Sequence, residues 1–371
     1  MKVGSLLVYY PFSLAQKVDS ASKSRPIEMI HAFEEWGEQE GIRVITITGD
    51  SKEREQQFDR LRKSGDLNDL LFCYMENQTI PLWLTDSGHF PKQPLIDLKV
   101  FRFLKSKEVP IGVFYRDAYW KFDEIYPLKG VKKAIMKMIY RLEERFYQTY
   151  AKTIFLPSEP MFPYVNIQKP KVALPPGGKK VIIHKRPSKD HTLRGIYVGG
   201  IREDTGIPIL IQAMEQVQEQ KLPFGLTIVC REQEYQSLPK ELRERISNLY
   251  VNVKHISGSE LQEEYQSADV GFIPFIPNKY NDFAVAFKLF EYLSNELPII
   301  ATECKAQTQI IQSGPYGVIC KPDVDDLVKA IQTMIEQQPK YVEEIKRSFA
   351  ERHSWIARAK TVYQELLQED L

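Results

Sequence analysis

Lys288 and Glu291 are the two residues whose types and spacing point most directly to chemistry. They lie between Phe283 and Thr302, where apolar residues recur at helical spacing until Pro298 and a short apolar run. The stretch therefore predicts a helix that leads into a buried strand. A lysine can pair with a phosphate, and a carboxylate can accept hydrogen bonds from a sugar diol. The two side chains together indicate a binding site for a nucleotide sugar.

The start of this helix offers a second means of binding an anion. Asn281 or Asp282 is the expected cap, so the first turn would present backbone N–H groups at the positive end of the helix dipole. The residues expected to contact a donor molecule there are Ala284, Val285 and Ala286.

A second group of candidates follows an expected strand at residues 111–115. Arg116 and Asp117 come at its carboxyl end, where open α/β sheets place ligands, and are candidates for catalysis. Tyr119 and Trp120 suit an acceptor site that stacks on a sugar. A plain salt bridge is the alternative for the charged pair. His89, in a loop after another expected strand, is a further acceptor candidate.

Length and composition narrow the class of protein. The 371 residues suggest two domains, and 43% hydrophobic with 27% charged residues is typical of a globular chain. A formal net charge of +1 argues against a dedicated nucleic-acid binder. Four singly scattered cysteines predict reduced core thiols in a cytoplasmic protein. The apolar N-terminal run predicts a first buried strand rather than a signal peptide, and no apolar run is long enough to span a membrane.

Strand-like and helix-like runs alternate along the chain, which predicts parallel, doubly wound α/β sheets. The first half has expected strands at 3–9, 44–48, 69–74, 81–84, 111–115 and 153–157. Leu174-Pro-Pro-Gly-Gly-Lys-Lys then interrupts the pattern. The alternation restarts with expected strands at 195–198, 226–230, 251–256, 270–274, 299–302 and 317–321. The expected domains are residues 1–174 and 179–352, followed by a closing helix within 353–371.

The second half resembles the nucleotide-sugar-binding domain of GT-B glycosyltransferases, in particular glycosyltransferase family 4. The resemblance rests on ordered pieces at Tyr197-Val-Gly-Gly-Ile, 259–270, Lys288-Leu-Phe-Glu-Tyr-Leu, Pro298-Ile-Ile-Ala-Thr and 317–323. It implies a GT-B fold, with two Rossmann-like domains whose parallel sheets face each other across a cleft. It also implies that the apolar face of Trp355, Ala359, Val362 and Leu366 returns to the first domain, with hinges near 175–178 and Arg352.

The resemblance assigns Glu291 to the carboxylate that accepts hydrogen bonds from the nucleotide ribose. The paired acid of the family's E-x7-E motif would fall at Phe283, which cannot hydrogen-bond a sugar. The family's two cations near the first strand of this domain align with Gly200 and Thr205. Lys288 and Arg202 are the candidates to replace them.

Gly199 and Gly200 would let the backbone approach the donor closely, although a tight strand exit is the plainer alternative. In the first half, the segment 111–120 looks like the strand end where relatives carry a His-Asp pair. Here Arg116 replaces the histidine, and Asp117 keeps the acid.

Asp323-Val-Asp325 superficially matches a metal-binding DxD motif, but it precedes an expected helix at 327–335, so helix capping is the preferred interpretation. No metal site and no cofactor are expected. The nucleotide sugar is a co-substrate, with UDP favoured over GDP.

Residues 129–145 predict a basic amphipathic helix with an apolar stripe opposite its cations. Such a helix could lie on anionic lipid, or it could be a core helix with a solvated basic face. The cations are Lys129, Lys132, Lys133, Lys137, Arg141 and Arg145, and the stripe is Val131, Ile135, Met138 and Leu142.

These features favour a metal-independent glycosyltransferase that moves a sugar from a nucleotide diphosphate to a glycan or lipid-linked glycan in cell-surface polysaccharide assembly. The resemblance implies retention of anomeric configuration. The scattered cysteines predict location in the cytoplasm, and the basic helix at 129–145 allows a place on the inner face of the membrane. Two alternatives stay open: an inactive GT-B partner subunit that binds glycan or stabilises a transferase, and a nucleotide-sugar epimerase or hydrolase.

Overall fold

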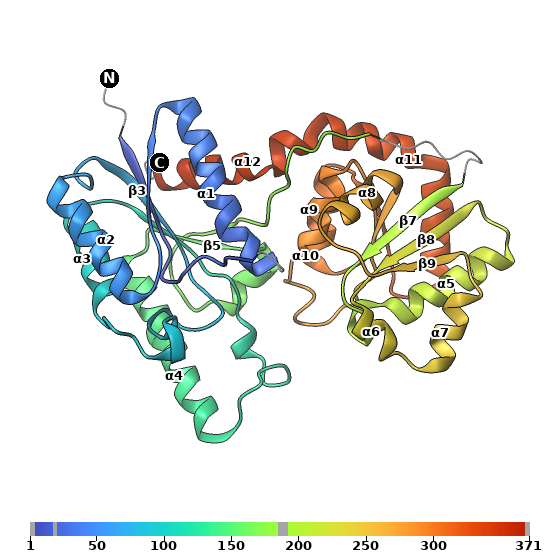
Figure 1. The fold of residues 1–371 in the computed structure, drawn as a ribbon, viewed down its shortest axis with the longest axis horizontal. Helices are drawn as coiled ribbons and strands as arrows, with labels where there is room; N and C mark the ends of the chain where they lie inside the picture. Colours follow the sequence, from blue (N-terminus) through green and yellow to red (C-terminus); the bar gives the residue numbers. More distant parts are fainter. Residues whose placement is uncertain (1–3, 18–20, 185–191, 368–371) are drawn as a thin grey trace. The chain divides into compact units, whose positions relative to one another are not determined.

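The computed structural model describes residues 4–17, 21–184 and 192–367, so Val3 and Gln368, at the ends of two expected elements, lie outside the described residues. The chain forms two compact units (Figure 1). Unit 1 comprises Met1–Gly177 and Trp355–Leu371, and unit 2 comprises Gly178–Ser354. Sequence analysis placed these boundaries at 174/179 and 352/353.

Unit 1 is built on a six-stranded parallel sheet with the order β2-β1-β3-β4-β5-β6. Its strands are β1 (Ser5–Tyr9), β2 (Arg43–Ile47), β3 (Leu70–Glu76), β4 (Ile111–Phe114), β5 (Thr153–Leu156) and β6 (Lys171–Ala173). Its helices are α1 (Ala21–Glu40), α2 (Ser51–Ser64), α3 (Ile96–Ser106), α4 (Gly130–Tyr150) and α12 (Trp355–Leu367), with 3-10 turns η1 (Leu82–Leu84), η2 (Ser87–His89), η3 (Tyr119–Lys121) and η4 (Glu159–Tyr164). Strands β1, β4 and β5 are buried along their whole length, as expected when helices cover both faces.

Unit 2 repeats the architecture with the strand order β12-β11-β10-β7-β8-β9. Its strands are β7 (Leu193–Val198), β8 (Phe224–Val229), β9 (Val251–Lys254), β10 (Val270–Ile273), β11 (Ile299–Thr302) and β12 (Gly317–Cys320). Its helices are α5 (Ile207–Glu219), α6 (Glu232–Gln236), α7 (Lys240–Ser247), α8 (Ser259–Ser267), α9 (Phe287–Ser294), α10 (Lys305–Ser313) and α11 (Val324–His353), and the 3-10 turn η5 spans Glu203–Thr205. The two parallel sheets give the two Rossmann-like domains of the GT-B fold.

Each sheet has one switch point, where successive connections leave in opposite directions. In unit 1 it lies between β1 and β3, and in unit 2 between β7 and β10. The loops that follow the two neighbouring strands run in opposite directions there, which leaves a crevice outside the carboxyl ends of these strands. The residues that follow these strands are therefore the first place to look for ligand contacts.

The C-terminal helix α12 packs within unit 1. The rings of Trp36 on α1 and Tyr363 on α12 are 4.8 Å apart, and the Arg358 guanidinium donates to the Pro176 carbonyl at 3.1 Å. The apolar stripe of this helix is buried, comprising Trp355, Ala359, Val362 and Leu366.

Three local expectations differ from the structure. Residues 81–84 were expected as a strand, but residues 82–84 form the 3-10 turn η1, and the Leu82 N–H donates to the Glu143 carboxylate at 2.8 Å instead of to a neighbouring strand. The short edge strand β6 was not expected. Helix α11 is far longer than the expected 327–335 and continues through Pro339.

The four cysteines are buried and unpaired, as expected from their scattered positions. In the described part of the chain, no helix has both the length and the apolar composition needed to cross a bilayer.

Candidate functional site

Lys288, the second residue of α9, lies at the switch point of unit 2. Its ammonium nitrogen is 4.1 Å from the centre of the Tyr197 ring, at the end of β7, and 5.0 Å from that of Phe275. Among the described residues, no carboxylate forms an ion pair with it. Aromatic rings attract a cation weakly and offer no hydrogen-bond acceptor of carboxylate strength, so the lysine is held in place but not neutralised.

This environment changes the protonation of Lys288. The pKa of its ammonium group is lowered to about 7, mainly because burial desolvates the charge; the Glu291 carboxylate raises this pKa, and the Arg202 charge lowers it. An anion bound beside the nitrogen would offset the desolvation and restore the charge. The electrostatics around Lys288 therefore favour the binding of an anion such as a phosphate.

Glu291 lies one turn further along α9 and is also partly buried. Tyr265 on α8 donates a hydrogen bond to its Oε2 at 3.1 Å. Burial raises the pKa of the Glu291 carboxyl, while the Tyr265 hydroxyl and Lys288 lower it. Tyr265 thus orients the carboxylate, a role that sequence reasoning missed because its partner lies 26 residues away.

Gly199 and Gly200 follow directly after β7, and Gly199 lies next to the Lys288 side chain. Gly199 has a φ of +144°, which disfavours any side chain, and a Cβ there would come within 2.7 Å of the Lys288 nitrogen. The Tyr197 hydroxyl donates to the Gly200 carbonyl at 2.6 Å. These contacts require glycine at 199 for close packing of backbone and lysine, and they make Tyr197 a second residue that sequence reasoning missed.

Arg202 lies in the same loop but points outward. Its side chain is 68% exposed and pairs with Asp204 at 2.9 Å. Its role as a donor-binding cation stays a prediction.

The expected caps of α9 are wrong. The helix begins at Phe287 after Ala286, which has no polar side chain and makes no side-chain cap. Asn281 instead donates to the Ile276 carbonyl at 2.8 Å, and Asp282 pairs with Lys305 at 3.0 Å. The loop after β10 is therefore held by hydrogen bonds within the loop and by an ion pair to α10. Ala284, Val285 and Ala286 precede the helix and do not form its first turn.

At the switch point of unit 1, one buried carboxylate forms ion pairs with two guanidinium groups. Glu76, at the end of β3, is fully buried and lies 3.3 Å from the Arg25 guanidinium and 3.2 Å from that of Arg116. Arg116 also donates to the Asn77 carbonyl at 3.2 Å, and Arg25 stacks on Phe114 at 3.6 Å. Arg116 thus forms an ion pair with Glu76, and a catalytic role for Arg116 stays a prediction.

Asp117 and Tyr119 lie in the loop after β4. The Asp117 carboxylate accepts a hydrogen bond from the Tyr119 backbone at 2.9 Å, which shapes the turn. The Tyr119 hydroxyl is 3.2 Å from that of Tyr140. Both side chains remain partly exposed and stay candidates.

Trp120 is 3% exposed, with Tyr140 stacked on one face at 4.8 Å and the Lys121 ammonium 4.7 Å from its centre. The prediction that Trp120 stacks on a sugar is wrong, because neighbouring side chains already cover the ring. His89 is exposed and bonds to the Leu84 carbonyl at 2.9 Å. Its turn is tied to the start of α2 through Asp86, which accepts from the Ser51 backbone at 2.8 Å.

Asp323 caps α11, accepting from the Asp326 backbone at 2.9 Å, and Asp325 lies in the first turn. Within 4–17, 21–184 and 192–367, no group of three or more His, Cys, Asp or Glu side chains is placed to hold a metal ion.

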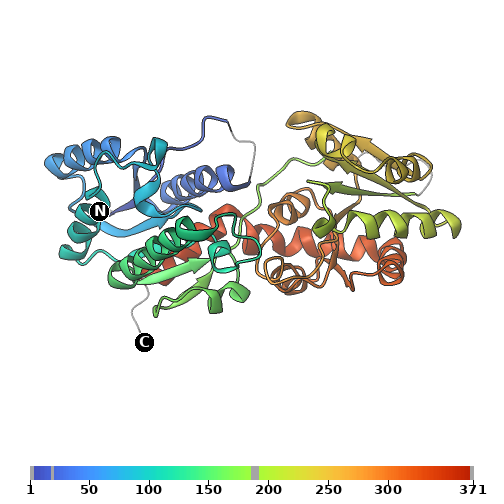
Figure 2. The same cartoon turned by 90° about the horizontal axis from the view of Figure 1, so that it is seen from below.

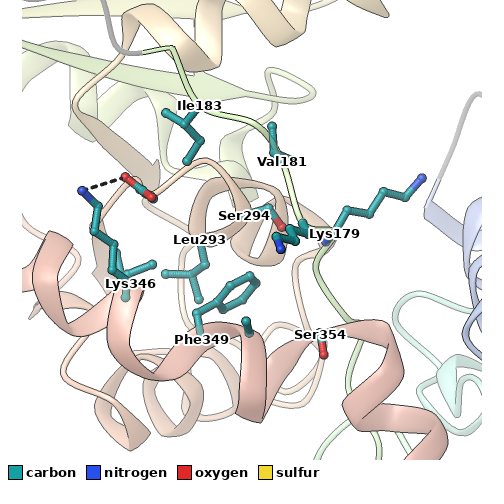
Figure 3. Close-up of a pocket in the computed structure, with 12 residues that line it drawn as sticks. Lys179, Val181, Ile183, Leu293, Ser294, Lys346, Phe349 and Ser354 are labelled. Carbon is teal, nitrogen blue, oxygen red and sulfur yellow. Dashed lines mark hydrogen bonds and ion pairs between the residues drawn. The ribbon is translucent and has the colours of Figure 1, made fainter. Parts of the chain in front are cut away.

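A pocket of about 310 Å³ lies elsewhere in unit 2, between residues 179–183 and helices α9 and α11 (Figure 3). Leu293, Ile345 and Phe349 form its apolar part, and Lys346 pairs with Glu296 at 3.2 Å on the rim. Neither Lys288 nor Glu291 lines it. The pocket is therefore separate from the candidate donor residues.

One family model matches part of unit 2. Residues 193–337 match the family model described as Glycosyl transferases group 1, and this range contains all the candidate residues of unit 2. Comparison with curated protein sequences gives no significant match.

Several solved structures share the whole fold. The structure of Anabaena HepE in complex with UDP-glucose has a TM-score of 0.57 and 12% identity, with 97% of this chain and 99% of that chain covered. A glycosyltransferase from Rickettsia africae has a TM-score of 0.57 and 13% identity, with 99% of each chain covered. WaaG, a glycosyltransferase involved in lipopolysaccharide biosynthesis, has a TM-score of 0.52 and 14% identity, with 99% and 100% covered. The chain therefore has the GT-B fold along its length, and residues 193–337 are similar to the glycosyl transferases group 1 model.

Proposed function

We propose that this protein is a glycosyltransferase that moves a sugar from a nucleotide diphosphate, UDP in the first place, to a hydroxyl group of a glycan. The observation that carries the proposal is Lys288, a desolvated lysine without a carboxylate partner among the described residues, held over Gly199 at the switch point of unit 2. A buried charge without a counter-charge costs stability, and a bound anion would offset that cost, which supports an anion site beside Lys288.

In the proposed complex, Lys288 and the uncapped start of α9 hold the diphosphate. Glu291, oriented by Tyr265, accepts hydrogen bonds from the ribose, and Gly199 and Gly200 admit the donor close to the backbone. Positive charge held beside the departing nucleotide stabilises the charge that develops on it as the glycosidic bond breaks. Asp117 acts on the acceptor hydroxyl or on the developing positive charge at the sugar.

The proposed acceptor is a glycan or lipid-linked glycan in cell-surface polysaccharide assembly, at the cytoplasmic side of a membrane. The names of solved neighbours support this class: one is described as bound to UDP-glucose, and others as lipopolysaccharide enzymes. We further propose retention of anomeric configuration and no requirement for a metal. If EDTA abolished transfer and Mn²⁺ or Mg²⁺ restored it, the metal-independent proposal would be wrong.

The test is a thermal-shift screen of the full chain against UDP-, GDP-, ADP- and dTDP-sugars, because a ligand that binds the folded state raises apparent stability. We expect the largest shift with a UDP-sugar, a strongly reduced shift in Lys288→Met, and an unchanged shift in Lys329→Met, which neutralises an exposed lysine on α11 of the same unit. Equal shifts in all three proteins would remove Lys288 from the donor site.

Incubation of the UDP-sugar with and without glycan acceptors then separates the alternatives. Transfer to the acceptor supports the proposal. Free sugar without an acceptor would indicate a hydrolase, a changed sugar an epimerase, and nucleotide binding without turnover of any acceptor an inactive partner subunit. Asp117→Asn is expected to depress transfer far more than nucleotide affinity, and parallel losses in both would assign Asp117 a structural role.

A further inference from the structure

Helix α4 exposes an apolar stripe that the proposed transfer reaction does not use. Val131 is 75% exposed, Ile135 48%, Met138 54% and Leu142 44%. Their spacings of four, three and four residues place them on one face of the helix. Scattered exposed apolar residues are ordinary, whereas a continuous stripe indicates an interaction surface.

The opposite face fixes the orientation of α4 in unit 1. Tyr140, Glu143, Glu144 and Tyr147 are its buried residues. Glu143 accepts hydrogen bonds from the Leu82 backbone at 2.8 Å and the Tyr147 hydroxyl at 2.9 Å. Glu144 pairs with Lys121 at 2.6 Å. The structure agrees with the alternative of a packed helix with a solvated basic face, except that the face packed on unit 1 carries tyrosines and glutamates and the apolar stripe is exposed.

Cations flank the exposed stripe. Lys132, Arg141 and Arg145 are exposed, and none of them forms an ion pair within the described part of the chain. Lys133 and Lys137 pair with Asp123 at 2.8 and 2.5 Å. Because both glutamates of α4 are buried, every exposed charge on this helix is positive. In Figure 1 the first turns of α4 extend beyond the other elements of unit 1, and Figure 2, seen from below, shows the helix on the near side of that unit.

We infer that this α4 surface, made of the four apolar residues with Lys132, Arg141 and Arg145, binds a lipid bilayer that contains anionic lipids. The apolar side chains enter the boundary between headgroups and acyl chains, and the cations contact the lipid phosphates. A second copy of the chain fits less well, because the two stripes would meet with like charges around them. The formal net charge is +1, so the attraction must come from this surface and not from the protein as a whole. The inference is independent of the transfer reaction.

Co-sedimentation of the full chain with vesicles tests the charges. We expect binding to phosphatidylcholine vesicles containing phosphatidylglycerol, and much weaker binding to phosphatidylcholine alone. Lys132→Gln, Arg141→Gln and Arg145→Gln combined should weaken the binding on the order of a hundredfold, since each basic residue near an anionic surface contributes about fivefold. The control combines Arg60→Gln, Arg62→Gln and Lys63→Gln, which remove the same charge from exposed positions on α2. Equal losses in the two triple variants would overturn the proposal.

The apolar stripe is tested separately. Ile135→Ser with Met138→Ser should lower vesicle binding at least tenfold and leave the circular dichroism spectrum unchanged, because both side chains are already exposed. Tyr250→Ser in unit 2, where the side chain is 66% exposed, should bind as the wild type does. Wild-type binding by the double serine variant would overturn insertion. Sedimentation equilibrium showing a dimer that the double variant dissociates would assign the stripe to a second copy instead.

Discussion

The two switch points of this molecule share a topology and differ in how their charges are balanced. In unit 1, Glu76 lies between two guanidinium groups, and the crevice residues hold one another. In unit 2, Lys288 faces aromatic rings, and Glu291 is held by one tyrosine hydroxyl. Removing one member of a buried ion pair strongly destabilises the fold, whereas a desolvated charge that has no ion pair favours an external partner. The same position in the same architecture thus holds an ion-paired carboxylate in one unit and, in the other, a lysine that has no ion pair among the described residues.

Glu76→Gln should have the largest effect. It leaves Arg25 and Arg116 buried without their carboxylate, and breaking a buried pair costs about 3–5 kcal/mol. All four tryptophans, Trp36, Trp83, Trp120 and Trp355, belong to unit 1, so the urea midpoint of tryptophan fluorescence reports on that unit. We expect a lower midpoint, with UDP affinity unchanged at temperatures where unit 2 is folded.

The control is Glu296→Gln, which removes the carboxylate of the more exposed pair with Lys346. Its cost should be about 1 kcal/mol or less. Similar costs for the two variants would contradict the contrast between the units.

Lys288→Met should weaken UDP binding and leave the stability of unit 1 unchanged. We expect UDP affinity, measured by calorimetry, to fall on the order of tenfold to a hundredfold, because a charge-assisted hydrogen bond contributes about 1.5–3 kcal/mol. The tryptophan unfolding midpoint should not change. A shift of that midpoint with intact UDP affinity would make Lys288 a structural residue.

The pH dependence of UDP binding should follow Lys288. Without UDP, the pKa of the Lys288 ammonium is about 7, below the ordinary 10.5. A bound phosphate raises this pKa, so UDP binding above pH 7 is accompanied by the uptake of a proton. Affinity should be flat below pH 7 and fall by up to about tenfold per pH unit above it, until the pKa of the complex is reached. Lys288→Met should lose this slope, and an identical slope in the variant would assign the titration to another group.

Tyr265→Phe should have the smallest effect. It removes the 3.1 Å hydrogen bond to Glu291, which should raise the pKa of that carboxyl further and weaken UDP binding several-fold, in line with about 1 kcal/mol for such a bond. Tyr235→Phe, on the neighbouring helix α6, is the matched control. No loss, or the same loss in both variants, would remove Tyr265 from the site.

By itself, the sequence determined the alternation of strands and helices, the two-unit organisation, and the presence of Lys288 and Glu291 near the start of one helix. These follow from local rules, because hydrophobic period and chain breakers act over a few residues. The apolar stripe of α4 was also visible, since helical spacing is a property of the sequence alone.

Only the tertiary structure decided which charges are paired and which faces are covered. Arg116 finds Glu76 at a separation of 40 residues, and Trp120 is covered by Tyr140 from another element. Helix α4 turns its glutamates and Tyr140 inward because unit 1 supplies partners for them: the Leu82 N–H and Lys121 for the glutamates, and the Thr79 carbonyl as acceptor for the Tyr140 hydroxyl. Helical period reveals that a helix has two faces. Which face is buried depends on residues that are distant in the sequence and meet only in the folded chain, so a local sequence pattern cannot predict it.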